Sequence, residues 1–366
     1  MRSCFCEPIS RVSNLSAEAQ QLSDIICEQA SQGPLGGRYV NVKPITRPDG
    51  DGAAGHFSLV LAGSDLRTRK DVAIKFLTPS TQGYRADCFR REAKISELLG
   101  GRRHITQMVG ELDQLSITLT TSLGTPFPLA ISFFALERGK ESVDTFLFGR
   151  RRPKPLFRRL EVVRDVVMGV NRLHSAGYCH RDLKPDNVLL FSGGIAKLAD
   201  LGTARRISGE ERLEADYSLP VGHLLYAAPE MFAGAGFLPS LYVGADWFGV
   251  GAILFEAVTN QNLWVAIGLR SPHEIKRTIA AAGSMTGYLA SVGRSASQYP
   301  IPSVSDYAAS PWLNPITDGT LDAVTRLIRS LCDFDFRRRL VAFPRVLHRL
   351  DAAILLARRD HFTGRI

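Results

Sequence analysis

The feature that most constrains this chain is one polar segment, HRDLKPDN, which runs from His180 to Asn187. It follows a helical pattern of apolar residues and precedes a short apolar run, Val188 to Leu190. In such a loop Asp182 can accept the proton of a hydroxyl, Lys184 can reach a phosphoryl group and Asn187 can coordinate Mg²⁺. No structural rule requires this combination in an ordinary charged loop, so the segment predicts a site of phosphoryl transfer.

The segment resembles the catalytic loop of the eukaryotic-type protein kinase family, with every polar position filled. The resemblance implies an α+β, bilobal fold with a strand-rich N-lobe, a helical C-lobe and ATP between the lobes. It implies that Asp182 is the catalytic base, that Lys184 assists the transfer and that Asn187 binds Mg²⁺. Lys184 is the residue type found in serine/threonine kinases, so the expected acceptors are serine and threonine hydroxyls of protein substrates.

A second match lies eighteen residues after Asp182, where an Asp-Leu-Gly triplet begins at Asp200. It resembles the metal-binding triplet of the family, and the resemblance implies that Asp200 binds the Mg²⁺ that bridges the β- and γ-phosphates of ATP. Leu201 replaces the usual Phe of this triplet. An apolar side chain of similar reach can still pack beneath the metal site.

A third match is the run Val72 to Lys75, which resembles the third strand of the family. Lys75 is then expected to hold the α- and β-phosphates, and Glu92 on the following predicted helix is expected to be its ion-pair partner. Taken singly, a strand lysine and a helix glutamate are usually surface residues. Their order ahead of the catalytic segment favours the functional interpretation.

A glycine-rich turn, in which Gly50, Gly52 and Gly55 fit the pattern G-x-G-x-x-G, lies between two strand-like runs. Because no helix follows it, the turn favours the phosphate lid of a kinase over a dinucleotide-binding turn. Phe57 occupies the place where the family usually carries a valine over the adenine. The resemblance implies further nucleotide contacts from Ala73, Glu137 and Leu189.

Other matches imply structural roles within the helical lobe. Glu230, in an Ala-Pro-Glu triplet, resembles the family acid that pairs with a buried arginine, here Arg339. Asp246 resembles the aspartate that braces the backbone of the catalytic loop. Two positions depart from the family pattern: His223 stands where a threonine is common, and Ser96 stands where an apolar residue is usual.

Arg181 precedes the catalytic aspartate, and a guanidinium there is favourably placed only when an anion meets it. The resemblance implies a regulatory phosphate between Asp200 and Glu230, for which Ser218 is the favoured acceptor. The acidic run from Glu210 to Asp216 could pair with Arg181 instead and leave the enzyme constitutively active.

The secondary-structure pattern changes along the chain. A polar helix is predicted from Ser16 to Ala30, and strand-like runs with one helix, Asp87 to Leu99, follow from Tyr39. Later apolar periodicities predict helices around 156–170, 246–258 and 321–331. The expected domains are an N-terminal helical extension and linker at 1–37 and a kinase domain at 38–360, divided into an N-lobe at 38–136, a hinge at 137–140 and a C-lobe at 141–360.

Composition is ordinary for a soluble globular protein, with 45% hydrophobic and 22% charged residues. No apolar stretch reaches the length of about 18 residues that a membrane span needs, so none is expected. The six cysteines show neither a metal-binding nor a disulfide pattern, which favours buried thiols and a cytoplasmic location. Alternatively, S-acylation of Cys4 and Cys6 would give weak membrane association.

The formal net charge of +9 gathers in three basic runs, at 150–159, 337–339 and 358–359. Nucleic acid is not an expected partner, because aromatic residues do not alternate with these charges as stacking platforms would. A solvated face is favoured over a patch that attracts acidic substrates or anionic lipid. The sequence leaves the oligomeric state open.

Two alternatives to a protein kinase follow from the same residues. A pseudokinase scaffold that binds nucleotide weakly is disfavoured, because it has no chemical need for Lys75, Glu92, Asp182, Asn187 and Asp200 together. A kinase for small metabolites is disfavoured because the Ala-Pro-Glu triplet and its arginine indicate a platform for protein substrates.

Overall fold

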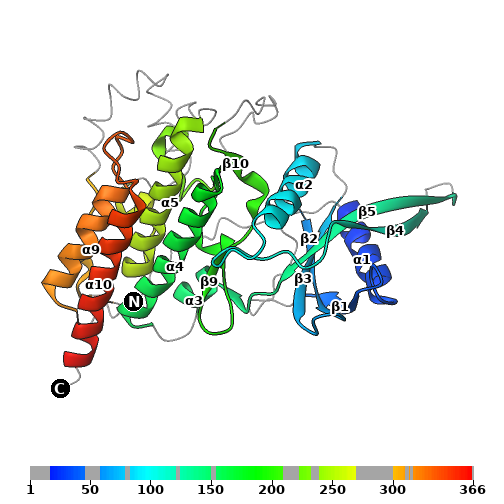
Figure 1. The fold of residues 1–366 in the computed structure, drawn as a ribbon, viewed down its shortest axis with the longest axis horizontal. Helices are drawn as coiled ribbons and strands as arrows, with labels where there is room; N and C mark the ends of the chain where they lie inside the picture. Colours follow the sequence, from blue (N-terminus) through cyan, green and yellow to red (C-terminus); the bar gives the residue numbers. More distant parts are fainter. Residues whose placement is uncertain are drawn as a thin grey trace. The chain divides into compact units, whose positions relative to one another are not determined.

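The computed structural model describes residues 17–45, 58–78, 83–120, 124–149, 154–208, 222–231, 239–268, 300–309, 313 and 316–364. The chain divides into two compact units. Unit 1 comprises Met1–Ala93 and Met108–Arg138, and unit 2 comprises Lys94–Gln107 and Gly139–Ile366. Strands dominate unit 1 and helices dominate unit 2 (Figure 1). The predicted α+β fold with a strand-rich and a helical part is therefore confirmed.

Unit 1 is built on an antiparallel sheet with the strand order β1-β2-β3-β5-β4. The strands are β1 (Tyr39–Pro44), β2 (Ser58–Asp65), β3 (Asp71–Leu77), β4 (Asp113–Thr120) and β5 (Pro126–Glu137). In β3, Val72, Ile74 and Phe76 are fully buried in the sheet core. Because side chains alternate across a strand, Ala73 and Lys75 share the opposite face.

The helix predicted near the N-terminus is present as α1 (Ala17–Ser31), and it contributes to the core of unit 1. Ile26 and Ala30 are buried together with Leu35 and Val42 in one hydrophobic cluster with the strands. Figure 1 shows α1 against the sheet. The boundary predicted after residue 37 stays a prediction.

The second helix, α2 (Gly83–Leu98), begins earlier than predicted. The sequence predicts Asp87 as its N-cap, and this is wrong because Asp87 lies inside the helix. There its carboxylate forms an ion pair with Arg90, 3.3 Å away and one turn later. An aspartate can support a helix through such a pair as well as by capping it, so the residue type alone does not locate the first turn.

Unit 2 consists mainly of helices packed around α5 (Pro239–Thr259). Its other helices are α3 (Val143–Phe148), α4 (Leu156–Ser175), α6 (Leu263–Ala266), α9 (Asp318–Leu331) and α10 (Phe343–Thr363), and its short strands are β6 (Glu141–Ser142), β7 (Tyr178–Cys179), β8 (Val188–Leu190), β9 (Ala196–Leu198) and β10 (Arg205–Arg206). Within α5, the stretch Leu241–Thr259 is long and apolar enough to cross a membrane, but 83% of it is buried inside the protein. This confirms the central buried helix predicted from the sequence.

The sequence favours a solvated face for the first basic run, and Arg159 shows that this prediction is wrong for one of its residues. Its side chain is fully buried, and its Nη1 donates to the carbonyl oxygens of Ala257 (2.6 Å) and Val258 (3.2 Å). Burial lowers the pKa of this guanidinium to about 10. The cation satisfies carbonyl groups at the C-terminal end of α5, where a helix carries partial negative charge.

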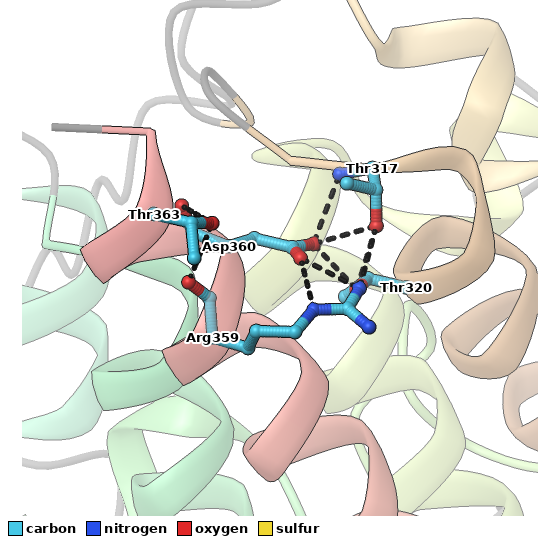
Figure 2. Close-up of polar contacts among 5 residues, drawn as sticks. All are labelled: Thr317, Thr320, Arg359, Asp360 and Thr363. Atoms are coloured by element: carbon cyan, nitrogen blue, oxygen red, sulfur yellow. Dashed lines mark hydrogen bonds and ion pairs between the residues drawn. The ribbon is translucent and has the colours of Figure 1, made fainter. Parts of the chain in front are cut away.

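The carboxylate of Asp360 performs the converse role at the start of α9. Its Oδ2 accepts hydrogen bonds from the backbone N–H of Thr317 (2.9 Å), the Thr317 hydroxyl (2.8 Å) and the Thr320 hydroxyl (2.6 Å), while Arg359 contacts its Oδ1. Figure 2 shows these groups around the carboxylate. Asp360 thus joins the last turn of α10 to the first turn of α9.

Asp360 is expected to stabilise the protein in a pH-dependent manner. Burial alone would raise its pKa, but the hydrogen bonds from Thr320, Thr317 and Arg359 outweigh burial and lower the pKa to about 2. The stabilisation is therefore present above the ordinary pKa of about 4 and is lost as the pH falls from about 4 to about 2. We expect Asp360→Asn to reduce the free energy of unfolding at neutral pH by about 2 kcal/mol.

Chemical denaturation between pH 7 and pH 2 measures this effect. The matched control is Asp322→Asn, which changes an exposed carboxylate on α9, the helix whose first turn Asp360 contacts. The two variants should differ at neutral pH and converge in acid. An equal stability of both variants at neutral pH would contradict the role of Asp360.

Candidate active site

The catalytic segment places Asp182 between several groups of unit 2. Its Oδ2 accepts a hydrogen bond from Asn187 Nδ2 at 3.0 Å and lies 3.5 Å from Lys184 Nζ. Its Oδ1 accepts a hydrogen bond from the backbone N–H of His223 at 2.7 Å. The structure therefore brings together the three residues that the sequence assigns to this loop and fixes the carboxylate from both sides.

Asp246, on the central helix α5, holds the backbone of the same loop. Its two carboxylate oxygens accept hydrogen bonds from the N–H groups of His180 and Arg181, each at 2.8 Å, and Oδ2 lies 2.8 Å from His174 Nε2. Burial would raise the pKa of this carboxyl, but the His174 hydrogen bond and the nearby histidines outweigh it and lower the pKa. The bracing role predicted from the resemblance is present.

His180 joins the loop to the metal-binding segment. Its Nδ1 accepts a hydrogen bond from the Asp182 N–H at 3.3 Å, so Nε2 carries the proton that is donated to the Ala199 carbonyl at 3.0 Å. The Ala199 N–H in turn donates to the Asn187 carbonyl at 2.9 Å. These bonds link the residues on either side of the site, so the positions of Asn187 and Asp200 are coupled.

Asp200 follows β9 as an exposed residue in the left-handed region, with φ 57°. Its neighbour Leu201 is 2% exposed and packs in the core of unit 2, as expected for the residue that replaces the usual Phe. The amide nitrogen of Asn187 donates hydrogen bonds to Asp182. The remaining polar groups are the amide oxygen of Asn187 and the carboxylate of Asp200, and both ligand types suit Mg²⁺. The residues present therefore fit the predicted metal.

In unit 1, the predicted ion pair between β3 and α2 is present. Lys75 Nζ lies 2.5 Å from Glu92 Oε2, and the two side chains are only 14% and 3% exposed. The buried carboxylate holds the ammonium group on the face of β3 that does not pack into the sheet core. The pairing inferred from the order of motifs is confirmed as a contact.

The structure describes only some of the other residues that are predicted to contact the nucleotide. Ala73 lies in β3, and Glu137 is the last residue of β5, paired with Val72. Leu189 lies in β8 of unit 2. It packs so close to Gly139 that a Cβ atom added to this glycine would lie only 2.9 Å from the Leu189 Cβ. Gly50, Gly52, Gly55 and Phe57, together with the predicted phosphorylation site Ser218, lie outside the described residues.

The segment 222–231 contacts the rest of unit 2 at three points. Besides the His223 backbone contact, the Tyr226 hydroxyl donates to Glu256 Oε2 at 2.5 Å, and Glu230 pairs with Arg339. Burial is the main cause that raises the pKa of Glu256 to about 7. The sequence does not predict the contact between Tyr226 and Glu256, because neither residue lies in a motif.

The pair between Glu230 and Arg339 is confirmed and is fully buried. Arg339 Nη1 lies 2.5 Å from Glu230 Oε1, Nη2 lies 3.1 Å from Oε2, and both side chains are 0% exposed. Arg339 also donates to the carbonyl oxygens of Gly244 and Asp333. A bidentate pair with further hydrogen bonds is the geometry in which buried charges are tolerated.

His223 differs from the threonine that is usual at its position, and it meets Asp182 through its backbone N–H. The ring Nδ1 accepts a hydrogen bond from the Leu225 N–H at 3.3 Å, whereas the His223 backbone N–H donates to the Asp182 carboxylate. Gly222 permits this approach: its φ is 109°, and a Cβ there would lie 2.7 Å from the Arg181 carbonyl oxygen. The signal that could have revealed this contact is the glycine rather than the histidine.

Comparison with known proteins agrees with this geometry. A family model described as the protein kinase domain matches residues 52–349. The chain belongs to the protein kinase family. Its matched region includes every described residue of the site above.

Curated relatives of this kinase domain are similar over shorter stretches. Human Rho-associated protein kinase 1 is 36% identical over 107 residues, 29% of this chain and 8% of that protein. A LIM domain-containing serine/threonine-protein kinase of Dictyostelium discoideum is 28% identical over 194 residues, 52% of this chain and 27% of that protein. The serine/threonine-protein kinase PknB of Lactococcus lactis is 33% identical over 102 residues, 28% and 15% of the two chains. The matches thus span less than a third of these relatives.

The buried pair between Glu230 and Arg339 is expected to anchor the segment 222–231, and this role can be tested. We expect Glu230→Ala to lower the free energy of unfolding by about 3 kcal/mol, because it leaves the Arg339 guanidinium buried without its carboxylate. Thermal melting measures the change. Glu161→Ala, which removes a partly exposed carboxylate from surface ion pairs, is the control and should change stability by less than about 1 kcal/mol. Equal melting temperatures for the two variants would contradict the anchoring role.

Gly222 gives a test of the contact between the kinase backbone and Asp182. We expect Gly222→Ala to lower kcat by about 10²-fold, because the clash with the Arg181 carbonyl displaces the His223 N–H. The control is Gly268→Ala, where φ is 91° but a Cβ meets nothing within 4 Å. Both variants bear backbone strain, so a similar loss of activity in both would show that strain, and not the lost contact, is responsible.

Proposed function

We propose that this protein transfers the γ-phosphoryl group of ATP to serine or threonine hydroxyls of protein substrates. The observation that supports this most is the orientation of Asp182, whose carboxylate is held by Asn187 on one oxygen and by the His223 N–H on the other. A base fixed in this way can accept the proton of one incoming hydroxyl. Membership of the protein kinase family supports the same reaction class.

In this proposal the residues of unit 2 act on the acceptor and the metal. Asp182 orients the hydroxyl and takes its proton, and Lys184, 3.5 Å from that carboxylate, is placed to stabilise charge on the transferring phosphoryl group. Asn187 and Asp200 would hold Mg²⁺. When bound, Mg²⁺ supplies neutralisation of the charge on the β- and γ-phosphates.

The residues of unit 1 would bind the nucleotide. Lys75 would hold the α- and β-phosphates, and Glu92 fixes its ammonium group at 2.5 Å. Ala73, on the same face of β3, and Glu137, at the end of β5, would contact the nucleotide base, as would Leu189 of unit 2. A scaffold without catalysis has no chemical need for this ion pair and the oriented Asp182 together.

Incubation with labelled ATP, Mg²⁺ and a mixed protein substrate tests the proposal, followed by identification of the labelled amino acids. We expect label on serine and threonine, and a loss of at least about 10²-fold in rate for Lys75→Met and for Asp182→Asn. Matched controls are Lys197→Met, which removes another strand lysine, and Asp322→Asn on the surface of α9. Both controls should retain activity.

Melting temperatures distinguish a catalytic loss from misfolding. If either Lys75→Met or Asp182→Asn kept more than a tenth of the wild-type rate, the role assigned to that residue would be wrong. Nucleotide binding without any transfer by the wild type would favour the scaffold, and label confined to tyrosine would overturn the acceptor class.

A further inference from the structure

Two basic runs that lie 200 residues apart in the sequence meet on one surface of unit 2. The start of α4 packs against the end of α10, and Arg158 and Arg358 both contact the carboxylate of Glu161. Farther along the same pair of helices, Arg164 Nε lies 2.6 Å from Asp351 Oδ1. The helices therefore run antiparallel, and this brings the first and third basic runs together.

Aromatic side chains lie among these cations. The Phe157 ring is approached by the guanidinium of Arg158 at 5.2 Å and by that of Arg358 at 5.8 Å. The same ring lies 5.1 Å from the ring of His361 and 6.1 Å from that of Phe362. Phe157 is 7% exposed, so it forms the base of the cluster, and the cations and Phe362 lie above it.

The outer part of this cluster is both apolar and basic. Leu355 is 65% and Phe362 is 60% exposed, the two most exposed large hydrophobic side chains described. Two helical turns separate them, so they lie on one face of α10. Arg359, between them in sequence and one turn after Leu355, is also exposed. We call the whole set the basic-aromatic surface: Phe157, Arg158, Leu355, Arg358, Arg359 and Phe362.

Carboxylates neutralise this surface only in part. Glu161 is shared by two arginines, and Asp360, which Arg359 contacts, is buried and already accepts three hydrogen bonds at the start of α9. The sequence also carries Arg150, Arg151 and Arg152 shortly before Lys154. A surface with three exposed arginines and few acidic groups attracts an anionic partner.

We propose that the basic-aromatic surface docks on a membrane that contains anionic phospholipids. The three arginines would contact lipid phosphates, while Leu355 and Phe362 would enter the boundary between headgroups and acyl chains. Exposed leucine favours lipid over nucleic acid, because an aliphatic side chain offers no stacking surface for a base. An acidic protein segment would satisfy the charges but would not account for the exposure of both apolar side chains.

Sedimentation of the full chain with lipid vesicles tests this proposal without any measurement of kinase activity. The probes are vesicles of phosphatidylcholine alone and of phosphatidylcholine mixed with phosphatidylserine. We expect binding only to the mixed vesicles, weakened by added salt. Each arginine near an anionic surface contributes about fivefold, so Arg158→Gln with Arg358→Gln should reduce the affinity by about 25-fold. Phe362→Ser should reduce it by about tenfold.

The matched control for charge is Arg326→Gln with Arg345→Gln, which removes two exposed cations from other parts of α9 and α10. It should bind as the wild type does. The proposal would be overturned by equal binding to both vesicle types, by no binding to either, or by equal losses in the two double variants. Binding of DNA or of an acidic peptide by a wild type that ignores vesicles would assign the surface to that partner instead.

Discussion

The loop from His180 to Asn187, which carries the candidate active site, depends on one buried carboxylate, that of Asp246. A charge this deeply buried costs several kcal/mol to desolvate unless hydrogen bonds offset the loss of water. Here two backbone N–H groups of the catalytic loop and His174 supply those bonds at 2.8 Å. The buried carboxylate depends on the N–H groups of the loop for its hydrogen bonds. The loop in turn depends on the carboxylate, because Arg181 has a φ of 70°, which an unsupported residue rarely adopts.

Further hydrogen bonds connect this contact to the other residues of the candidate site. His180, whose N–H is fixed by Asp246, uses its ring to connect the Asp182 N–H to the carbonyl before Asp200. The strained Arg181 turn presents its carbonyl to Gly222, where a side chain would collide and displace the His223 N–H from Asp182. Asp182, Asn187 and the segment 222–231 thus belong to one hydrogen-bonded network that includes Asp246 of α5.

Residues whose chemistry fixes both their type and their spacing could be predicted from the sequence. Lys75 and Glu92 were of this kind, and their ion pair follows the prediction. Asp182 and Asn187 were identified in the same way and are in contact, while the roles assigned to them stay predictions. The contact of the His223 backbone was not predicted, because the motif directs attention to the side chain at position 223, whereas the only trace of the backbone contact is the glycine before it. The start of α2 was misplaced at Asp87 because an aspartate suits either a cap or an ion pair within a helix.

Neighbouring arginines show most clearly why charge runs resist prediction from sequence. Arg158 and Arg159 are adjacent, yet about 100° of helix rotation separates them. One is therefore on the surface beside Phe157, and the other is fully buried against the carbonyls that end α5. The second basic run divides in the same way: Arg337 and Arg338 are exposed, whereas Arg339 is enclosed with Glu230. The buried arginines hold helices and segments together, and only the exposed ones are available to a partner, so a net charge of +9 becomes a localised surface through the packing of α4 against α10.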